Sequence, residues 1–230
     1  MFAGHIGAAL AIGRAERRIN IGAFIAAALL LDLLLWLFVL LEWEAVAISP
    51  NFTSTHQPEF IFPFSHGLVA SLVWSAVAGA VALAWSAYQR APSWRAGALI
   101  AAAVFSHWLL DALVHRPELP LAGANSAKVG FGLWQNMPIA LTAEAAIVVI
   151  GLSLYLTGND LPRRNAIGLA ALTLITLAFT AVGMTIAPAP PSARAMASSS
   201  LGALVVICAL GCWLGRSRRE RQADQASPLE

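Results

Sequence analysis

The stretch that decides the fold is AGALIAAAVFSHWLLDALVH, residues 96–115. It is apolar over the length of a membrane span, yet it contains His107 and Asp111, with His115 four residues further on. At 3.6 residues per helical turn, these three side chains lie roughly on one face. Ionisable side chains are costly inside a membrane and are functional candidates there. The spacing H-x-x-x-D also offers a metal ion two ligands from one rigid helix.

The composition of the chain is that of a polytopic membrane protein. Of its 230 residues, 59% are hydrophobic and only 11% are charged, whereas soluble domains have about 25% charged residues. The apolar runs are continuous and rich in Leu and Ala, which favours helices over the alternating pattern of a β-barrel. We therefore predict an all-α transmembrane bundle, formed as a single domain by residues 1–215, and a disordered cytoplasmic tail over residues 216–230.

Seven apolar segments follow one another along the chain. The first, residues 2–13, would extend over only about 18 Å as a helix, which is too short for a hydrocarbon core of about 30 Å. We expect it to be a half-helix that enters the bundle from one side. The others are long enough to cross the membrane: residues 21–41, 66–88, 96–115, 138–156, 166–186 and 197–215. The prediction is six spans plus a short N-terminal helix.

The basic residues are distributed unequally between the two sides of these spans. Of the 14 lysines and arginines, 11 fall on one side: Arg14, Arg17, Arg18, Arg90, Arg95, Arg163, Arg164, Arg216, Arg218, Arg219 and Arg221. Loops on the cytoplasmic side of a membrane carry such an excess. We therefore expect a multi-pass protein of the plasma (inner) membrane with a cytoplasmic C-terminus, and loops 42–65, 116–137 and 187–194 that face outward.

Helical rise places several ionisable side chains at a similar depth. His107, for example, lies 12 residues beyond Arg95, which corresponds to about 18 Å above the cytoplasmic boundary. Five segments bring acidic or imidazole groups to the middle-to-outer layer of the membrane in this way: His5, Asp32, His66, His107, Asp111 and Glu144. Convergence of so many groups is harder to explain by isolated hydrogen bonds than a single buried histidine would be.

A metal ion is the simplest partner for this set. Three of the groups are carboxylates, and the sequence embeds no lysine or arginine at that depth to offset their repulsion. A divalent metal would supply the positive charge. Mixed histidine and carboxylate ligands favour Zn²⁺, with Mn²⁺ or Fe²⁺ as alternatives. A relay of protons along the histidines and aspartates, as in a transporter, is the other interpretation.

The order of these residues resembles that of the YdjM-type family, which is described as LexA-regulated, membrane-bound, metal-dependent hydrolases: His5, Asp32, Ser65-His66 and His107-x-x-x-Asp111. It is also similar to the order of metal ligands in the zinc-dependent phospholipase C fold. The resemblance extends to about residue 140 and implies metal ligands at His5, Asp32, His66, His107 and Asp111. The chain departs from the family pattern where Leu-Leu-Asp32 replaces an expected Pro-Asp-x-Asp, and where FSHG replaces T-H-S.

The sequence thus favours a membrane-embedded, metal-dependent hydrolase that acts on a phosphoester or lipid-type substrate at the outer face of the membrane. We expect Glu144 or an unligated carboxylate to act as general base. His115 and Arg116, one turn above the site, would contact an anionic headgroup or leaving group. The expected partners are the lipid bilayer and this substrate, without nucleic acid; the oligomeric state stays open. Two alternatives also stay open: a transporter or channel that uses the same cluster, and a non-catalytic bundle with a structural metal.

Overall fold

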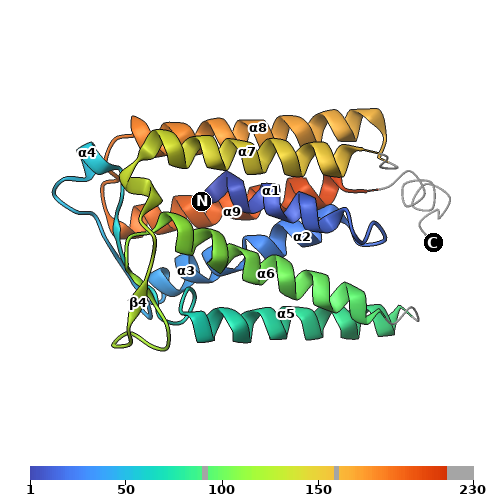
Figure 1. Cartoon of the computed structure of the whole chain (residues 1–230), viewed down its shortest axis with the longest axis horizontal. Coiled ribbons are helices and arrows are strands. Elements are labelled where there is room, and N and C mark those ends of the chain that lie inside the picture. Colours follow the sequence, from blue (N-terminus) through green and yellow to red (C-terminus); the bar gives the residue numbers. More distant parts are fainter. Residues whose placement is uncertain (90–92, 158–160, 217–230) are drawn as a thin grey trace, which may run out of the picture.

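The computed structural model describes residues 1–89, 93–157 and 161–216, and it confirms the all-α bundle (Figure 1). Its main helices are α1 (Phe2–Gly13), α2 (Ile21–Ala28), α3 (Leu30–Leu40), α5 (Leu68–Tyr88), α6 (Trp94–Val114), α7 (Met137–Leu156), α8 (Arg163–Thr185) and α9 (Ala193–Leu214). Within the described ranges, α5 to α9 are long and apolar enough to cross a membrane, and α1 is a short apolar helix. Apart from Arg216, the predicted tail lies outside the described residues.

The segment predicted as one span over residues 21–41 is instead two helices, α2 and α3, with a bend of 51° between them. The pair can still form a sixth span, so the predicted number of spans holds approximately. Neither proline nor glycine occurs at the break around Leu29. The carbonyl oxygen of Ala28 instead accepts a hydrogen bond from Nδ1 of His107, 2.6 Å away. A side chain that takes over a helix carbonyl in this way interrupts the helical ladder and bends the helix.

Several helices begin at positions other than those predicted because polar residues cap them. Ser93 accepts a hydrogen bond from the backbone N–H of Ala96, so α6 begins at Trp94 rather than at residue 96. Ser192 does the same for Ala195, and α9 begins at Ala193 rather than at residue 197. Serine at this position satisfies backbone donors that the first helical turn leaves unpaired.

Close helix packing holds α1 inside the bundle. Figure 1 shows α1 between the layer that contains α7 and α8 and the pair α5 and α6. A Cβ atom added at Gly151 of α7 would lie 2.0 Å from the carbonyl oxygen of Gly7 in α1. Small residues allow such approach between helices in membranes. Gly79 and Gly97 bring α5 and α6 together in the same way, because a Cβ at either would lie within 3 Å of the other's carbonyl oxygen.

Two loops cover one end of the bundle, which we call the loop end. The first contains strand β1 (Ala45–Ala47), short helix α4 (Phe52–Thr55) and strand β2 (Glu59–Ile61), and β1 pairs antiparallel with β2. The second contains β3 (Leu119–Pro120), its antiparallel partner β4 (Lys128–Val129) and the 3₁₀ helix η1 (Leu133–Gln135). Both lie at the left in Figure 1. Both segments were predicted as outward-facing loops, and the two small sheets within them were not predicted.

The opposite end, which we call the arginine end, is fixed by side chains that reach neighbouring helices. Arg14 Nη1 donates to the carbonyl oxygen of Leu154 at 2.6 Å, and Arg95 Nη2 donates to that of Ala15 at 2.9 Å. Asn165 Nδ2 in α8 donates to the carbonyl oxygen of Leu214 in α9 at 2.7 Å. These hydrogen bonds satisfy carbonyl groups at helix ends and tie the helices to one another.

Candidate metal centre

The five residues that resemblance suggested as metal ligands meet near the loop end of the bundle. α1 carries His5, α3 carries Asp32, His66 lies just before α5, and α6 carries both His107 and Asp111. All are buried except Asp32, whose side chain keeps 19% of its exposure. His107 links the bend between α2 and α3 to the site. Its Nδ1 donates to the carbonyl oxygen of Ala28 at the bend, and its Nε2 points at the cluster.

Three ligand atoms form a triangle that matches a metal site. His66 Nε2 lies 3.1 Å from His107 Nε2 and 3.4 Å from Asp111 Oδ2, and His107 Nε2 lies 3.2 Å from the same oxygen. Zinc–ligand bonds of about 2.0–2.1 Å in a tetrahedron place ligand atoms about 3.3 Å apart. We call these three residues the ligand triangle. A tetrahedral ion held by it would retain one position for a further ligand.

The hydrogen bonds of the two histidines direct their lone pairs into the triangle. His107 Nδ1 must donate to the carbonyl oxygen of Ala28, because a carbonyl only accepts. His66 Nδ1 lies 2.8 Å from Ser65 Oγ, which gives its own proton to Glu44 Oε2 at 2.6 Å. His66 Nδ1 must therefore donate to Ser65. In the neutral rings, both Nε2 atoms are then unprotonated acceptors, as metal ligation requires.

Glu44 is a supporting residue that the sequence analysis missed. One of its oxygens accepts from the backbone N–H groups of Phe64 and Ser65 at 2.7 and 2.8 Å, and the other accepts from Ser65 Oγ. Burial raises the pKa of the Glu44 carboxyl above its ordinary value, against the effect of these hydrogen bonds. No pattern in the sequence distinguishes Glu44 from the neighbouring Glu42, because its role depends on how the first loop folds back over α5.

His5 and Asp32 form a second group that overlaps the first. Together with His107 they offer ligand atoms within 4.8 Å of one another. The ring of His5 stacks on that of His107 at 3.6 Å, and its Nε2 lies 3.2 Å from Asp111 Oδ1. Its Nδ1 is buried without a hydrogen-bond partner among the described residues. A buried nitrogen with a free lone pair fits a site that holds a cation.

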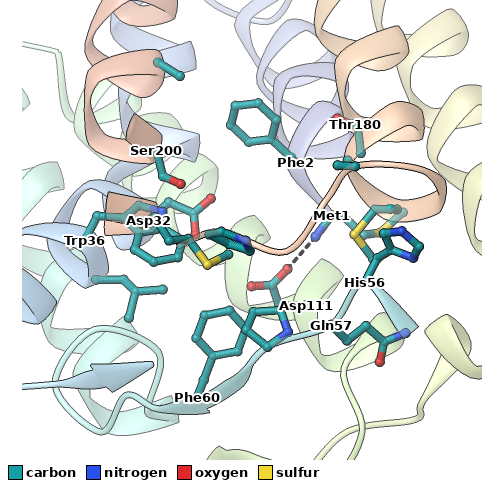
Figure 2. A pocket seen from close by; sticks show the side chains of 18 of the residues that line it. Met1, Phe2, Asp32, Trp36, His56, Gln57, Phe60, Asp111, Thr180 and Ser200 are labelled. Carbon is teal, nitrogen blue, oxygen red and sulfur yellow. Dashed lines mark hydrogen bonds and ion pairs between the residues drawn. The ribbon is translucent and has the colours of Figure 1, made fainter. Parts of the chain in front are cut away.

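Asp111 belongs to the ligand triangle and Asp32 to the second group, and each also lies close to histidines of the other group. The second oxygen of Asp111, Oδ1, pairs with the amino group of Met1 at 2.9 Å, which Figure 2 draws as a dashed line. Asp32 Oδ1 lies 3.6 Å from the Nε2 atoms of both His66 and His107. Neither the cavity nor the described cluster contains a lysine or arginine. The donor set is therefore histidine and carboxylate, which suits zinc and other first-row divalent ions.

The two residues predicted to take part in catalysis lie close to this cluster. Glu144 in α7 is buried, and its Oε1 accepts from the backbone N–H of Gly4 at 2.9 Å. His115 was expected at the rim, but it is also buried, with Nε2 3.8 Å from Asp111 Oδ2. Its Nδ1 lies 2.6 Å from Glu118 Oε1, a second residue that the sequence analysis missed. The loop after α6 folds back over His115 and brings Trp134 to within 4.3 Å of its ring, which accounts for the burial.

A cavity of about 410 Å³ opens beside the cluster. His5, Asp32, His66, Asp111, His115 and Glu144 form its polar part, and Figure 2 shows the carboxyl group of Asp111 pointing into it. The rest of the lining comes from α1, α3, α4, η1, α8, α9, the first loop and the loop between α8 and α9. A pocket of this size, mostly apolar with a few convergent polar groups, is typical of a binding site for a small molecule.

Comparison of the chain with protein-family models, with curated proteins and with solved structures finds no match.

Proposed function

We propose that the protein is a membrane-embedded, metal-dependent hydrolase that acts on a phosphoester or lipid-type substrate. One observation carries this proposal: the ligand triangle of His66, His107 and Asp111 has the spacing of a zinc site. A tetrahedral ion bound by these three residues would keep a fourth position for water or for Asp32, whose Oδ1 lies 3.6 Å from both histidine Nε2 atoms. Three protein ligands with one open position are typical of catalytic zinc, whereas structural zinc has four. His66 and Asp111 also line the cavity, so a substrate there is adjacent to the triangle.

The chemistry would divide between the metal and the surrounding residues. A divalent metal held by His66, His107 and Asp111 would supply Lewis acidity toward a phosphoryl or acyl oxygen and would activate water near neutral pH. Glu144 or Asp32 accepts a proton as general base, since both carboxylates line the same cavity. Glu118 holds the His115 ring with Nε2 toward the cluster, where the imidazole would contact an anionic oxygen of the substrate or leaving group.

The arrangement also supports a location for the reaction. The long apolar helices indicate a membrane protein. We propose that the arginine end is cytoplasmic, with the C-terminus on that side, because most of the basic residues flank it. The loop end, and with it the metal centre, would then face outward from the plasma (inner) membrane. A lipid or lipid-linked phosphoester reaches such a site along the membrane.

Metal content provides the first test. The full-length protein is purified in detergent, and bound zinc, manganese and iron are measured by mass spectrometry for the wild type and for His107→Ala combined with Asp111→Ala. We expect about one or more metal ions per wild-type chain and strong loss in the double variant. Leu109→Ala combined with Leu113→Ala is the matched control, because these residues lie on the exposed side of the same helix. Full occupancy in the histidine–aspartate variant would disprove the site.

Turnover provides the second test. The metal-loaded protein is incubated with a chromogenic phosphodiester and, in nanodiscs, with a fluorogenic phospholipid. We expect release of product that requires the ligand triangle. Metal binding without turnover of either probe, together with flux of protons or metal ions into liposomes, would refute the hydrolase and support a transporter built on the same cluster.

A further inference from the structure

The cavity has a second, apolar part that the hydrolytic chemistry does not use. It lies between α8 and α9, at their ends nearest the loop end of the bundle. Its lining residues include Thr180, Gly183 and Met184 from α8, and Met196, Ala203 and Leu204 from α9. Figure 2 shows Thr180 and Ser200 on opposite sides of this space, with Phe2 between them. The pocket thus joins a charged cluster to an apolar arm.

Two of the three lining hydroxyl groups on this arm, those of Thr180 and Ser199, are hydrogen-bonded within their own helices; the third belongs to Ser200. Thr180 Oγ1 donates to the carbonyl oxygen of Thr176 at 2.9 Å, and Ser199 Oγ donates to that of Ala195 at 2.9 Å. Such local bonds leave mainly the methyl and methylene groups of these residues available to a ligand. With Ser200 as its one other hydroxyl, the arm is mostly apolar, so it suits a hydrocarbon better than a sugar or a peptide, which would need several hydrogen-bonding partners.

The arm also reaches the lipid-facing surface of the bundle. Phe179 lines the cavity and yet is 61% exposed, and Ser199 on the facing helix is likewise both a lining residue and exposed. At the arginine end the two helices are joined through Asn165 and Leu214, so the opening is confined to their outer halves. Both helices are candidate spans. The lining also includes Ala187 and Pro188 of the loop between the two helices, so the space extends from that loop to the exposed surface of two candidate spans.

We infer that this arm, between α8 and α9, binds the hydrocarbon chain of an amphiphilic substrate whose polar group lies at the histidine–aspartate cluster. The inference rests on the proposed function, because it takes the cluster as the site of the polar group. An anionic oxygen suits a metal held by the ligand triangle, and an acyl or prenyl chain suits the arm. The substrate is then a lipid that enters sideways, and a free water-soluble phosphoester would occupy only half of the pocket.

Two glycines provide a matched pair of variants. A Cβ atom added at Gly183 meets nothing within 4 Å, and the same is true at Gly202. Gly183 lines the cavity, whereas Gly202 is not among its lining residues and is exposed on α9. Gly183→Phe should therefore fill the arm without displacing backbone, and Gly202→Phe should add the same side chain outside it. Ala203→Phe should fill the arm from the α9 side. It tests the same site independently if the phenylalanine at residue 183 adopts a rotamer that points out of the arm.

The experiment measures chain binding without turnover. Metal-loaded full-length protein in nanodiscs is incubated with a non-hydrolysable phosphonate analogue of phosphatidic acid that carries a diazirine in its acyl chain. After irradiation, labelled peptides of α8 and α9 are quantified against those of α5, which reports non-specific contact with lipid. We expect enrichment on the lining residues, reduced about tenfold by Gly183→Phe and by Ala203→Phe, as exclusion of roughly two methylene groups would do. Gly202→Phe should label like the wild type.

The controls separate this inference from the proposed function. Competition with unlabelled phosphatidic acid should remove the enrichment, whereas glycerol 3-phosphate, which has the same phosphate without a chain, should not. Metal content should be normal in Gly183→Phe. Equal labelling in the wild type, Gly183→Phe and Ala203→Phe overturns the chain site even if metal binding is intact. If the purified protein binds no metal but its α8 and α9 peptides are still enriched, the chain site is supported and the metal-dependent hydrolase is refuted.

Discussion

His66 Nε2 and His107 Nε2 lie 3.1 Å apart, although both imidazoles have committed their Nδ1 protons elsewhere. Two neutral rings held in this way direct lone pairs at each other, which is unfavourable without a cation between or beside them. Either an additional proton or a metal ion resolves the conflict. A metal ion would bind both nitrogens and Asp111 Oδ2 at once, since this oxygen lies within 3.4 Å of both nitrogens.

Removal of the metal should therefore destabilise the protein. Thermal unfolding in detergent is compared between a sample with EDTA and a sample with free Zn²⁺. At about 100 times its dissociation constant, Zn²⁺ should raise the free energy of unfolding by about 2.7 kcal/mol relative to the sample with EDTA. The variant His107→Ala with Asp111→Ala should show no such shift. A wild-type transition that is identical with and without metal would contradict the assignment.

Ser65→Ala should weaken metal binding without removing a ligand. The substitution deletes the oxygen that accepts from His66 Nδ1, so the ring loses its preferred orientation and tautomer. Loss of a partner that orients a histidine typically reduces metal affinity by about 10–100-fold. Ser75→Ala is the control, because Ser75 is also buried but donates to the carbonyl oxygen of Ser71 in α5, away from the cluster. Metal titration monitored by calorimetry compares the two.

Glu44→Gln should weaken metal binding by reversing a chain of hydrogen bonds. The amide oxygen still accepts from the N–H groups of Phe64 and Ser65, but the amide nitrogen now donates to Ser65 Oγ. The hydroxyl proton of Ser65 then turns to His66 Nδ1, and the ring proton moves to Nε2, where it blocks ligation.

Metal affinity and thermal stability together test this explanation. We expect affinity to fall about as much as in Ser65→Ala, roughly 10–100-fold, with the fold retained, since the loop keeps its backbone hydrogen bonds. Glu42→Gln, a neighbour outside this network, is the control. Unchanged affinity in Glu44→Gln would show that Glu44 does not set the tautomer of His66.

The sequence was sufficient to predict what depends on depth along a helix. His5, Asp32, His107 and Asp111 could be placed at similar levels because the rise per residue is constant. Their lateral approach could not be derived, since it depends on close contacts such as Gly7 against Gly151. It was the convergence of costly ionisable groups that indicated a common site.

The features that sequence reasoning missed depend on tertiary contacts. Nothing local predicts the bend at Leu29, because it involves a hydrogen bond from His107, far away in the chain. Glu44 and Glu118 lie in loops, where no periodicity reports which side chains turn inward. The burial of His115 likewise follows from the second loop, whose Trp134 packs against its ring.

Glu144→Gln should separate catalysis from metal binding. The glutamine oxygen can still accept from the N–H of Gly4, so α1 and α7 keep this contact. If Glu144 is the general base, turnover of the fluorogenic phospholipid should fall by about 10²–10⁴-fold, while metal content stays normal. Full turnover in Glu144→Gln would transfer that role to Asp32, the other candidate carboxylate of the cavity.

The contact between Gly7 and Gly151 should be essential for the position of His5. In Gly151→Ala the new methyl group would lie 2.0 Å from the carbonyl oxygen of Gly7, which is backbone and cannot rotate away. α1 must then move from α7. We expect a loss of about 1–3 kcal/mol in the free energy of unfolding, typical of overpacking. Because α1 also carries His5, metal affinity should fall with it. Gly202→Ala, where the methyl group meets nothing within 4 Å, should instead be neutral or stabilise α9 by up to about 1 kcal/mol. Equal thermal stability of the two alanine variants would contradict the close packing of α1 on which the metal centre depends.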